Sequence, residues 1–138
     1  MNEPITQAFP VPLETAFLAA DNLYVVFKNA DDVSTINPDM NLVKTLSDHG
    51  VGITAQGTGE YDCVSRLFFP AIDLNEDPVT GSAHAAIGPY WAKKLGKKKL
   101  TAYQASKRGG ILYLDIGTDR LTISGRAVTY MRGDFNIP

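Results

Sequence analysis

The sequence has little of what several protein classes require. A single cysteine, Cys63, excludes an internal disulfide and suits a reducing compartment. No run of 18 apolar residues is present, so no membrane-spanning helix is expected. The net charge of −2 over 138 residues gives no basic footprint for nucleic acid. Because the start MNEPITQAFPVP has no basic region followed by an apolar run, we expect a cytoplasmic protein without membrane or nucleic-acid partners.

Sequence motifs that indicate a metal centre or a catalytic nucleophile are also missing. Cys63 lies in the run YDCVSRLFF, which predicts a small core or strand residue rather than a nucleophile. The two histidines, His49 and His84, lack suitably spaced partners for a metal. There is no phosphate loop and no GxSxG elbow. We therefore expect neither a metal nor an organic cofactor.

The composition and the hydrophobic patterns predict one α+β domain. With 44% hydrophobic and 20% charged residues, the chain can bury a sizeable core. Strands are predicted at 22–28, 51–56 and 60–70, and four more in the last forty residues: LTAYQAS, GGILYLDI, DRLTISG and AVTYMRG. Most of these strands are joined by hairpin-length turns. A curled, mostly antiparallel sheet or barrel is the expected architecture.

Two helices are predicted to accompany this sheet. The first begins at Asn37-Pro38-Asp39, with Asn37 as the N-cap, and closes at Gly50. The second presents one apolar face, formed by Ile87, Tyr90, Trp91 and Leu95, and ends near Gly96. We expect the sheet to wrap around this second helix. Residues 1–20, which contain three prolines within the first 13 positions, are predicted to be an extended lead-in segment, and 21–138 to be the domain.

The stretch NEDPVTGSAH (75–84) opens the second helix and is the main candidate for chemistry. Asp77 precedes Pro78, so its backbone should be extended, and Glu76 and Asp77 should then point to opposite sides. The free N–H groups of Gly81, Ser82 and Ala83 would point at one spot, which suits a carboxylate or phosphate. An anion cradle beside Asp77 could hold an acidic substrate while the aspartate moves a proton.

Helix capping alone offers a competing explanation for the same stretch. Asp, Thr and Ser are the residues that helix starts select, and Thr80 or Ser82 could cap this helix. On spacing alone, both explanations stay open. Serine catalysis by Ser82 is disfavoured because no general base has an obvious place beside it.

The sequence resembles the PhzF-like family, the phenazine-biosynthesis-like isomerases and epimerases. The resemblance rests on EDPVTGSAH, GPYW, QAS-RGG and a final G-AVT stretch, in the same order and at similar spacing. It covers nearly the whole chain but only the C-terminal half of a family protein. It implies one diaminopimelate epimerase-like domain, with the lead-in segment as the former connection between two similar domains.

The resemblance also implies site residues and a function. Asp77 matches a motif aspartate, and Gly81 and Ser82, followed by Ala83, match an anion-binding turn. Substrate contacts are further implied for the QAS-RGG segment, in particular for Arg108, Gly109 and Gly110. The implied reaction is cofactor-independent proton transfer on a small carboxylate-bearing substrate in a cleft between two domains.

The family's acid/base glutamate belongs to the half that is not represented here. A homodimer or a separate polypeptide for the N-terminal half would complete the cleft. The alternative is a non-catalytic subunit that binds small acids, or an inactive remnant of such an enzyme.

Overall fold

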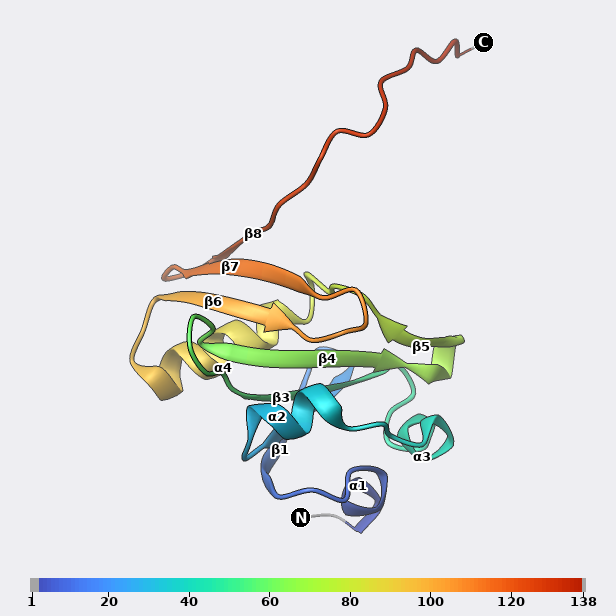
Figure 1. Ribbon diagram of the computed structural model, residues 1–138, viewed down its shortest axis with the longest axis vertical. Helices are drawn as coiled ribbons and strands as arrows, with labels where there is room; N and C mark the ends of the chain where they lie inside the picture. The colour runs from blue at the N-terminus through green and yellow to red at the C-terminus, as the bar shows by residue number, and fades with distance from the viewer. Residues whose placement is uncertain (1–2, 138) are drawn as a thin grey trace.

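The computed structural model describes residues 3–137, and its centre is one mixed sheet of eight strands. The strand order is β1-β2-β3-β4-β6-β7-β8, and β5 pairs with β4 outside this path (Figure 1). The bounds are β1 (Leu13–Ala19), β2 (Asn22–Phe27), β3 (Gly50–Gln56), β4 (Cys63–Phe69), β5 (Leu74–Asp77), β6 (Lys99–Gln104), β7 (Gly110–Ile116) and β8 (Leu121–Ser124). Only β2/β3 and β4/β6 pair in parallel, so the sheet is mostly antiparallel, as expected.

Helices lie on both faces of the sheet. They are α1 (Glu3–Ala8), α2 (Ala30–Thr35), α3 (Met40–Lys44), the 3-10 turn η1 (Pro70–Ile72) and α4 (His84–Leu95). The short helices α1, α2 and α3 cover one core, which includes Phe9, Val25 and Ile53. The single long helix, α4, covers the other core, which includes Tyr24, Ile87 and Trp91. None of the helices within residues 3–137 has the length and apolar character needed to cross a membrane.

The sheet curls around α4, as the apolar face of this helix predicted. Trp91 is fully buried, and its indole N–H donates to the Thr54 hydroxyl of β3 at 2.9 Å. Near the other end of the strand order, a Cβ at Gly88 would lie 3.2 Å from Leu114 of β7, so helix and strand approach closely. The sheet does not close into a barrel, because β1 and β8 terminate the order. Gly96 ends α4 in the left-handed conformation, with φ of 67°.

The prediction of an extended lead-in segment over residues 1–20 is wrong for most of its length. Residues 3–8 form α1, which buries Ile5 and Ala8, and Phe9 beyond it is buried as well. Leu13–Ala19 is extended but pairs with β2 as a strand of the same sheet. The prolines misled the prediction because the first turn of a helix tolerates proline. The part of this prediction that covers residues 1–2 lies outside the described residues, and a former role as interdomain connection stays a prediction.

Two further predictions need correction. The helix after Asn37 is shorter than expected: Asp39 is its N-cap, accepting from the Asn41 amide at 2.8 Å, and it ends at Lys44. Gly50 does not close the helix but begins β3. The stretch AVTYMRG (127–133) is no strand, because residues 125–137 have no regular structure. The strands predicted around 22–28, 51–56, 60–70 and 100–125 are confirmed.

Candidate active site

The candidate site lies at a break in the sheet beside β4. In the first half of β4, Ser65 pairs with Gln104 of β6. Two residues later, Leu67 pairs instead with Asp77, the last residue of β5. One edge of β4 is therefore shared by two strands, and the end of β6 meets the end of β5 there. Backbone groups at such a junction lose their ladder partners and need other ones.

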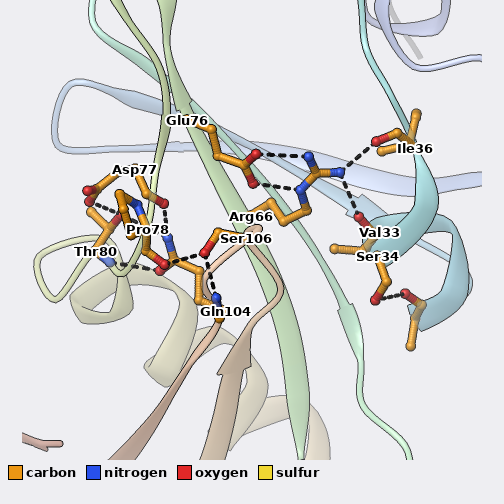
Figure 2. Close-up of polar contacts among 12 residues, drawn as sticks. Val33, Ser34, Ile36, Arg66, Glu76, Asp77, Pro78, Thr80, Gln104 and Ser106 are labelled. Carbon is orange, nitrogen blue, oxygen red and sulfur yellow. Dashed lines mark hydrogen bonds and ion pairs between the residues drawn. The ribbon is translucent and has the colours of Figure 1, made fainter.

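The Gln104 side chain supplies these partners. It is fully buried, and its Oε1 accepts from the Thr80 backbone N–H at 2.8 Å. Its Nε2 donates to the Asp77 carbonyl at 2.8 Å and to the Thr80 hydroxyl at 3.1 Å. Figure 2 shows this side chain reaching across the turn between Asp77 and Thr80. One amide side chain thus fixes the backbone that carries the candidate aspartate.

The Thr80 hydroxyl extends this network to the Asp77 carboxylate. Because the Thr80 Oγ1 accepts from Gln104, its own hydrogen is free to point at Asp77, and it donates to Oδ2 at 2.5 Å. No hydrogen bond among residues 3–137 uses the other carboxylate oxygen, Oδ1. Asp77 is half-buried. One of its oxygens is therefore held by the protein, and the other is available to a guest.

His84, the first residue of α4, bonds to the same turn through its ring. It is fully buried; its Nδ1 lies 2.8 Å from the Thr80 carbonyl and its Nε2 lies 3.3 Å from the Ser65 hydroxyl. A carbonyl can only accept, so Nδ1 carries the proton and Nε2 accepts from Ser65. Burial lowers the pKa of the His84 imidazole, while the hydrogen bond to Thr80 acts in the opposite direction. His84 is thus a neutral structural partner of the turn.

The QAS-RGG segment clamps the turn from the side of β7. The Ser106 hydroxyl donates to the Pro78 carbonyl at 2.7 Å and accepts from the Gly109 amide at 3.1 Å. Gly109 has a φ of +71°, which a side chain would strain. A Cβ at Gly110 would lie 2.2 Å from Val79, so only glycine fits there. In the structure, Gly109 and Gly110 therefore serve packing; their predicted contact with substrate stays a prediction.

Glu76 and Asp77 point to different sides, as the extended backbone predicted (Figure 2). Glu76 forms a two-pronged ion pair with Arg66, with distances of 2.7 Å and 3.0 Å. Arg66 also donates to the carbonyls of Val33 and Ile36 at the end of α2. Glu76 is therefore occupied in holding α2 to β4, which leaves Asp77 as the carboxylate of the site.

The turn predicted as an anion cradle exposes Gly81 and Ser82, but Ala83 is fully buried, so the predicted contact of the Ala83 amide with a guest is not open in this structure. No hydrogen bond among residues 3–137 starts from the backbone N–H of Gly81, Ser82 or Ala83. A Cβ at Gly81 would meet no atom within 4 Å, so the space in front of the turn is open. The capping explanation is wrong for this helix: its N-cap position, Ala83, has no side-chain cap, and the Thr80 hydroxyl points to Asp77 instead.

Arg108 lies between two open hollows next to the turn. One, of about 510 Å³, is lined by Glu76, Pro78, Ser106, Lys107 and Arg108. The other, of about 620 Å³, is lined by residues that include Val79, Arg108–Gly110 and Ile123–Arg126. Arg108 is exposed and could meet an anionic ligand in either hollow. In the described part of the chain, no group of three His, Cys, Asp or Glu side chains could hold a metal.

Sequence reasoning missed the roles of Gln104, Thr80 and His84. Gln104 belongs to the QAS-RGG motif, but nothing local shows that its amide fills a break between strands that lie far apart in sequence. The usable signal was an uncharged polar residue ending an otherwise apolar alternating strand. Cys63 is buried as predicted, and burial, with a smaller contribution from Asp62, raises the pKa of its thiol to about 12.

Comparison with known proteins places the chain in a family. The sequence profile described as "Phenazine biosynthesis-like protein" (PhzC-PhzF) matches residues 2–133. The chain belongs to the PhzC-PhzF family. An uncharacterized isomerase of Halalkalibacterium halodurans is 49% identical over 72% of this chain and 38% of its own length. One of Pseudomonas aeruginosa is 41% identical over 90% of this chain and 48% of its own length.

A solved structure of this PhzC-PhzF family agrees with the fold. The crystal structure of a PhzF-family phenazine biosynthesis protein from Enterococcus faecalis has a TM-score of 0.89 and 38% identity. It covers 99% of this chain and 52% of the Enterococcus chain. The chain thus spans about half the length of this structure and less than half of the two curated relatives. The family and the fold implied by the motifs are confirmed.

Replacing Gln104 by methionine should destabilise the protein. Methionine has a similar length but cannot pair the buried Thr80 N–H and Asp77 carbonyl, so the free energy of unfolding should fall by about 2–4 kcal/mol. Urea denaturation measures this change. The matched control is Gln56→Met at the exposed end of β3, which should change stability by less than about 0.5 kcal/mol. Equal effects of the two variants would contradict the role given to Gln104.

His84 should make stability depend on pH. Its pKa is lowered in the folded state, so below about pH 6.5 the unfolded chain takes up a proton that the folded chain does not. The free energy of unfolding should therefore decline from pH 7.5 to 5.5, by up to about 1.4 kcal/mol per pH unit. His84→Gln should reduce this slope, because it removes the buried imidazole. An unchanged slope in the His84 variant would refute the assignment.

Proposed function

We propose that the chain is the catalytic domain of an isomerase that moves a proton on a small carboxylate-bearing metabolite without a cofactor. The observation that carries this proposal is one arrangement: a carboxylate with an oxygen that no hydrogen bond among residues 3–137 uses, close in sequence to the unpaired backbone amides of the exposed Gly81 and Ser82. The isomerase names of the Halalkalibacterium and Pseudomonas relatives support the reaction class. The epimerase or tautomerase type of the reaction is part of the proposal.

In this proposal the amides of the exposed Gly81 and Ser82 hold the substrate carboxylate, while Ala83, predicted as a third contact, is buried behind them. They stand at the N-terminal end of α4, where the helix dipole favours negative charge. When a proton leaves the neighbouring carbon, charge develops on the carboxylate oxygens, and the same amides stabilise it. Asp77 Oδ1 accepts that proton or returns it, while Oδ2 stays bonded to Thr80 and keeps the carboxylate in place.

The exposed setting of the cradle supports a second body opposite it. Gly81 and Ser82 are exposed, and both hollows beside the turn are open. Proton transfer at carbon benefits from a site that excludes water, because the amides then act in a low dielectric. We propose that a second copy or a polypeptide equivalent to the rest of the relatives' length closes the cleft and brings the second acid/base group.

A binding subunit without catalysis is the second candidate function. The same cradle would bind small acids even if no second acid/base group ever faced Asp77. The openness of Gly81 and Ser82 favours this reading of the isolated chain. In this case the ligand class is unchanged, but no proton leaves carbon. An inactive remnant would show neither property.

Asp77→Asn should abolish proton exchange and keep the fold. Small amino acids and aromatic acids in D₂O, followed by proton NMR, report exchange at carbon by the loss of C–H signal. The assay uses the chain alone and together with the remaining half of the Enterococcus faecalis protein. The variant should be at least about 100-fold slower, because it loses the proton carrier. Undiminished exchange in the variant refutes the role of Asp77; binding without exchange in the unmodified chain favours the binding subunit.

Gly81→Asp should remove acid binding with little effect on stability. The new carboxylate would stand in open space in front of the cradle, since a Cβ there meets no atom within 4 Å. It would repel an anionic ligand and compete for the amides. A thermal shift that small acids give the unmodified chain should disappear in this variant. Gly133→Asp, at an equally open glycine with the same charge change, is the control and should keep the shift.

A further inference from the structure

The loop between β6 and β7 carries two adjacent cations that the protein does not pair. Lys107 and Arg108 are both exposed. No ion pair among residues 3–137 uses either side chain. Single unpaired cations are common on protein surfaces. Two adjacent ones beside the turn that carries a candidate catalytic carboxylate are a local concentration of positive charge.

This cationic loop, residues 105–109, is fixed at both ends. Its first N–H group, that of Ala105, donates to the Ser65 carbonyl of β4 at 2.8 Å. Its last, that of Gly109, donates to the hydroxyl of Ser106, and this hydroxyl in turn donates to the turn before α4. The backbone that carries the two cations is therefore preorganised, so an anion can bind there without first ordering the main chain.

The charges around the loop favour an anion. The hollow of about 510 Å³ is lined by both Lys107 and Arg108, and Glu76 is the acid in its lining. Glu76 is neutralised by its ion pair with Arg66. Asp77, the next residue along the chain, adds one negative charge near the hollow, against the two positive charges of the loop. The loop therefore attracts an anionic group even while Asp77 is ionised.

The cationic loop lies within reach of a ligand held at the cradle. Pro78 lines the same hollow, and Gly81 of the cradle follows it three residues later. Three residues of chain span about 10 Å at full extension. A straight molecule of about four to eight carbons can cover this distance, since the long side chains of Lys107 and Arg108 reach toward its far end.

From this placement we infer that the substrate carries two anionic groups, one held by the amides of Gly81 and Ser82 and the other by the cationic loop. The inference rests on the ligand class of the proposed function and narrows it from small carboxylates to dicarboxylates. Arg108 is the residue that selects them, because its planar guanidinium can hold a carboxylate through two parallel hydrogen bonds. A monocarboxylate of equal length leaves the loop empty.

The test measures dissociation constants of the unmodified chain for straight dicarboxylates from succinate to suberate by titration calorimetry. The monoamide of each acid is the matched ligand, with the same length and one charge fewer. The best dicarboxylate should bind at least about tenfold more tightly than its monoamide, because its second contact forms within the complex. Arg108→Gln should reduce this ratio to about two or less, because the second contact is lost.

Arg120→Gln is the control variant. It removes the same charge from the exposed turn between β7 and β8, at the other end of β7 from the cationic loop. The ratio should stay as it is in the unmodified chain. Gly81→Asp examines the opposite end of the ligand and should weaken the dicarboxylate and its monoamide alike.

Three results would overturn the inference. One is a ratio near one for every dicarboxylate, or no binding of any of them. Another is a ratio that Arg108→Gln leaves unchanged, since a different group would then recognise the second charge. The third is dicarboxylate binding that survives Gly81→Asp, since the first charge would then lie away from the cradle.

The proposed reaction fails or succeeds on a different readout, exchange at carbon. A preference for dicarboxylates without exchange would refute the isomerase alone and leave a subunit that binds dicarboxylates. Exchange on monocarboxylates without any preference for a second charge would refute this inference alone.

Discussion

The structure of the candidate site depends on how one side chain repairs a break in the sheet. Where β4 changes its neighbour from β6 to β5, the Asp77 carbonyl and the N–H of the buried Thr80 are both bonded by the Gln104 side chain. A buried, unpaired backbone group costs roughly 1–3 kcal/mol. Glutamine can meet both needs at once, because its amide is donor and acceptor on one rigid group. The side chain of Gln104 does so, and its second N–H orients the Thr80 hydroxyl toward Asp77.

The strand break also determines which amides are paired at the start of α4. The N–H groups of His84, Ala85 and Ala86 bond to the carbonyls of the preceding turn, whereas those of Gly81, Ser82 and Ala83 have no partner among residues 3–137. Three side chains bond to the carbonyl and N–H groups of the turn: Gln104, His84 and Ser106. Asp77 and the turn before α4 are therefore held in place by side chains that lie behind them. The other side of this turn, at Gly81 and Ser82, faces solvent.

Local patterns predicted the parts of the fold that depend on local physics. Leu112 and Leu114 alternate with the exposed Tyr113 and Asp115, so β7 could be placed, and the apolar face around Trp91 identified α4. Helix α2 was missed because its six residues bury only Val33, too little for a periodic signal. The sequence predicted the divergent directions of Glu76 and Asp77, while the role of Asp77 and of the turn amides in binding stays a prediction. The role of Gln104 could not be predicted from the sequence. It follows from the pairing of β4 with both β5 and β6, whose last residues, Asp77 and Gln104, lie 27 positions apart in the sequence.

Residues 125–137 show a second case in which local patterns do not determine the structure. AVTYMRG reads as a strand by composition, yet it forms none, because strand propensity is expressed only against a neighbour that offers hydrogen bonds and an apolar surface. The failed prediction is therefore informative. Val128, Tyr130 and Met131 have the residue types of a strand but remain exposed, because β8 ends at Ser124 and no strand of residues 3–137 pairs with the segment beyond it. Residue type therefore predicts a strand only where the fold also supplies an edge to pair with, which a single sequence does not reveal.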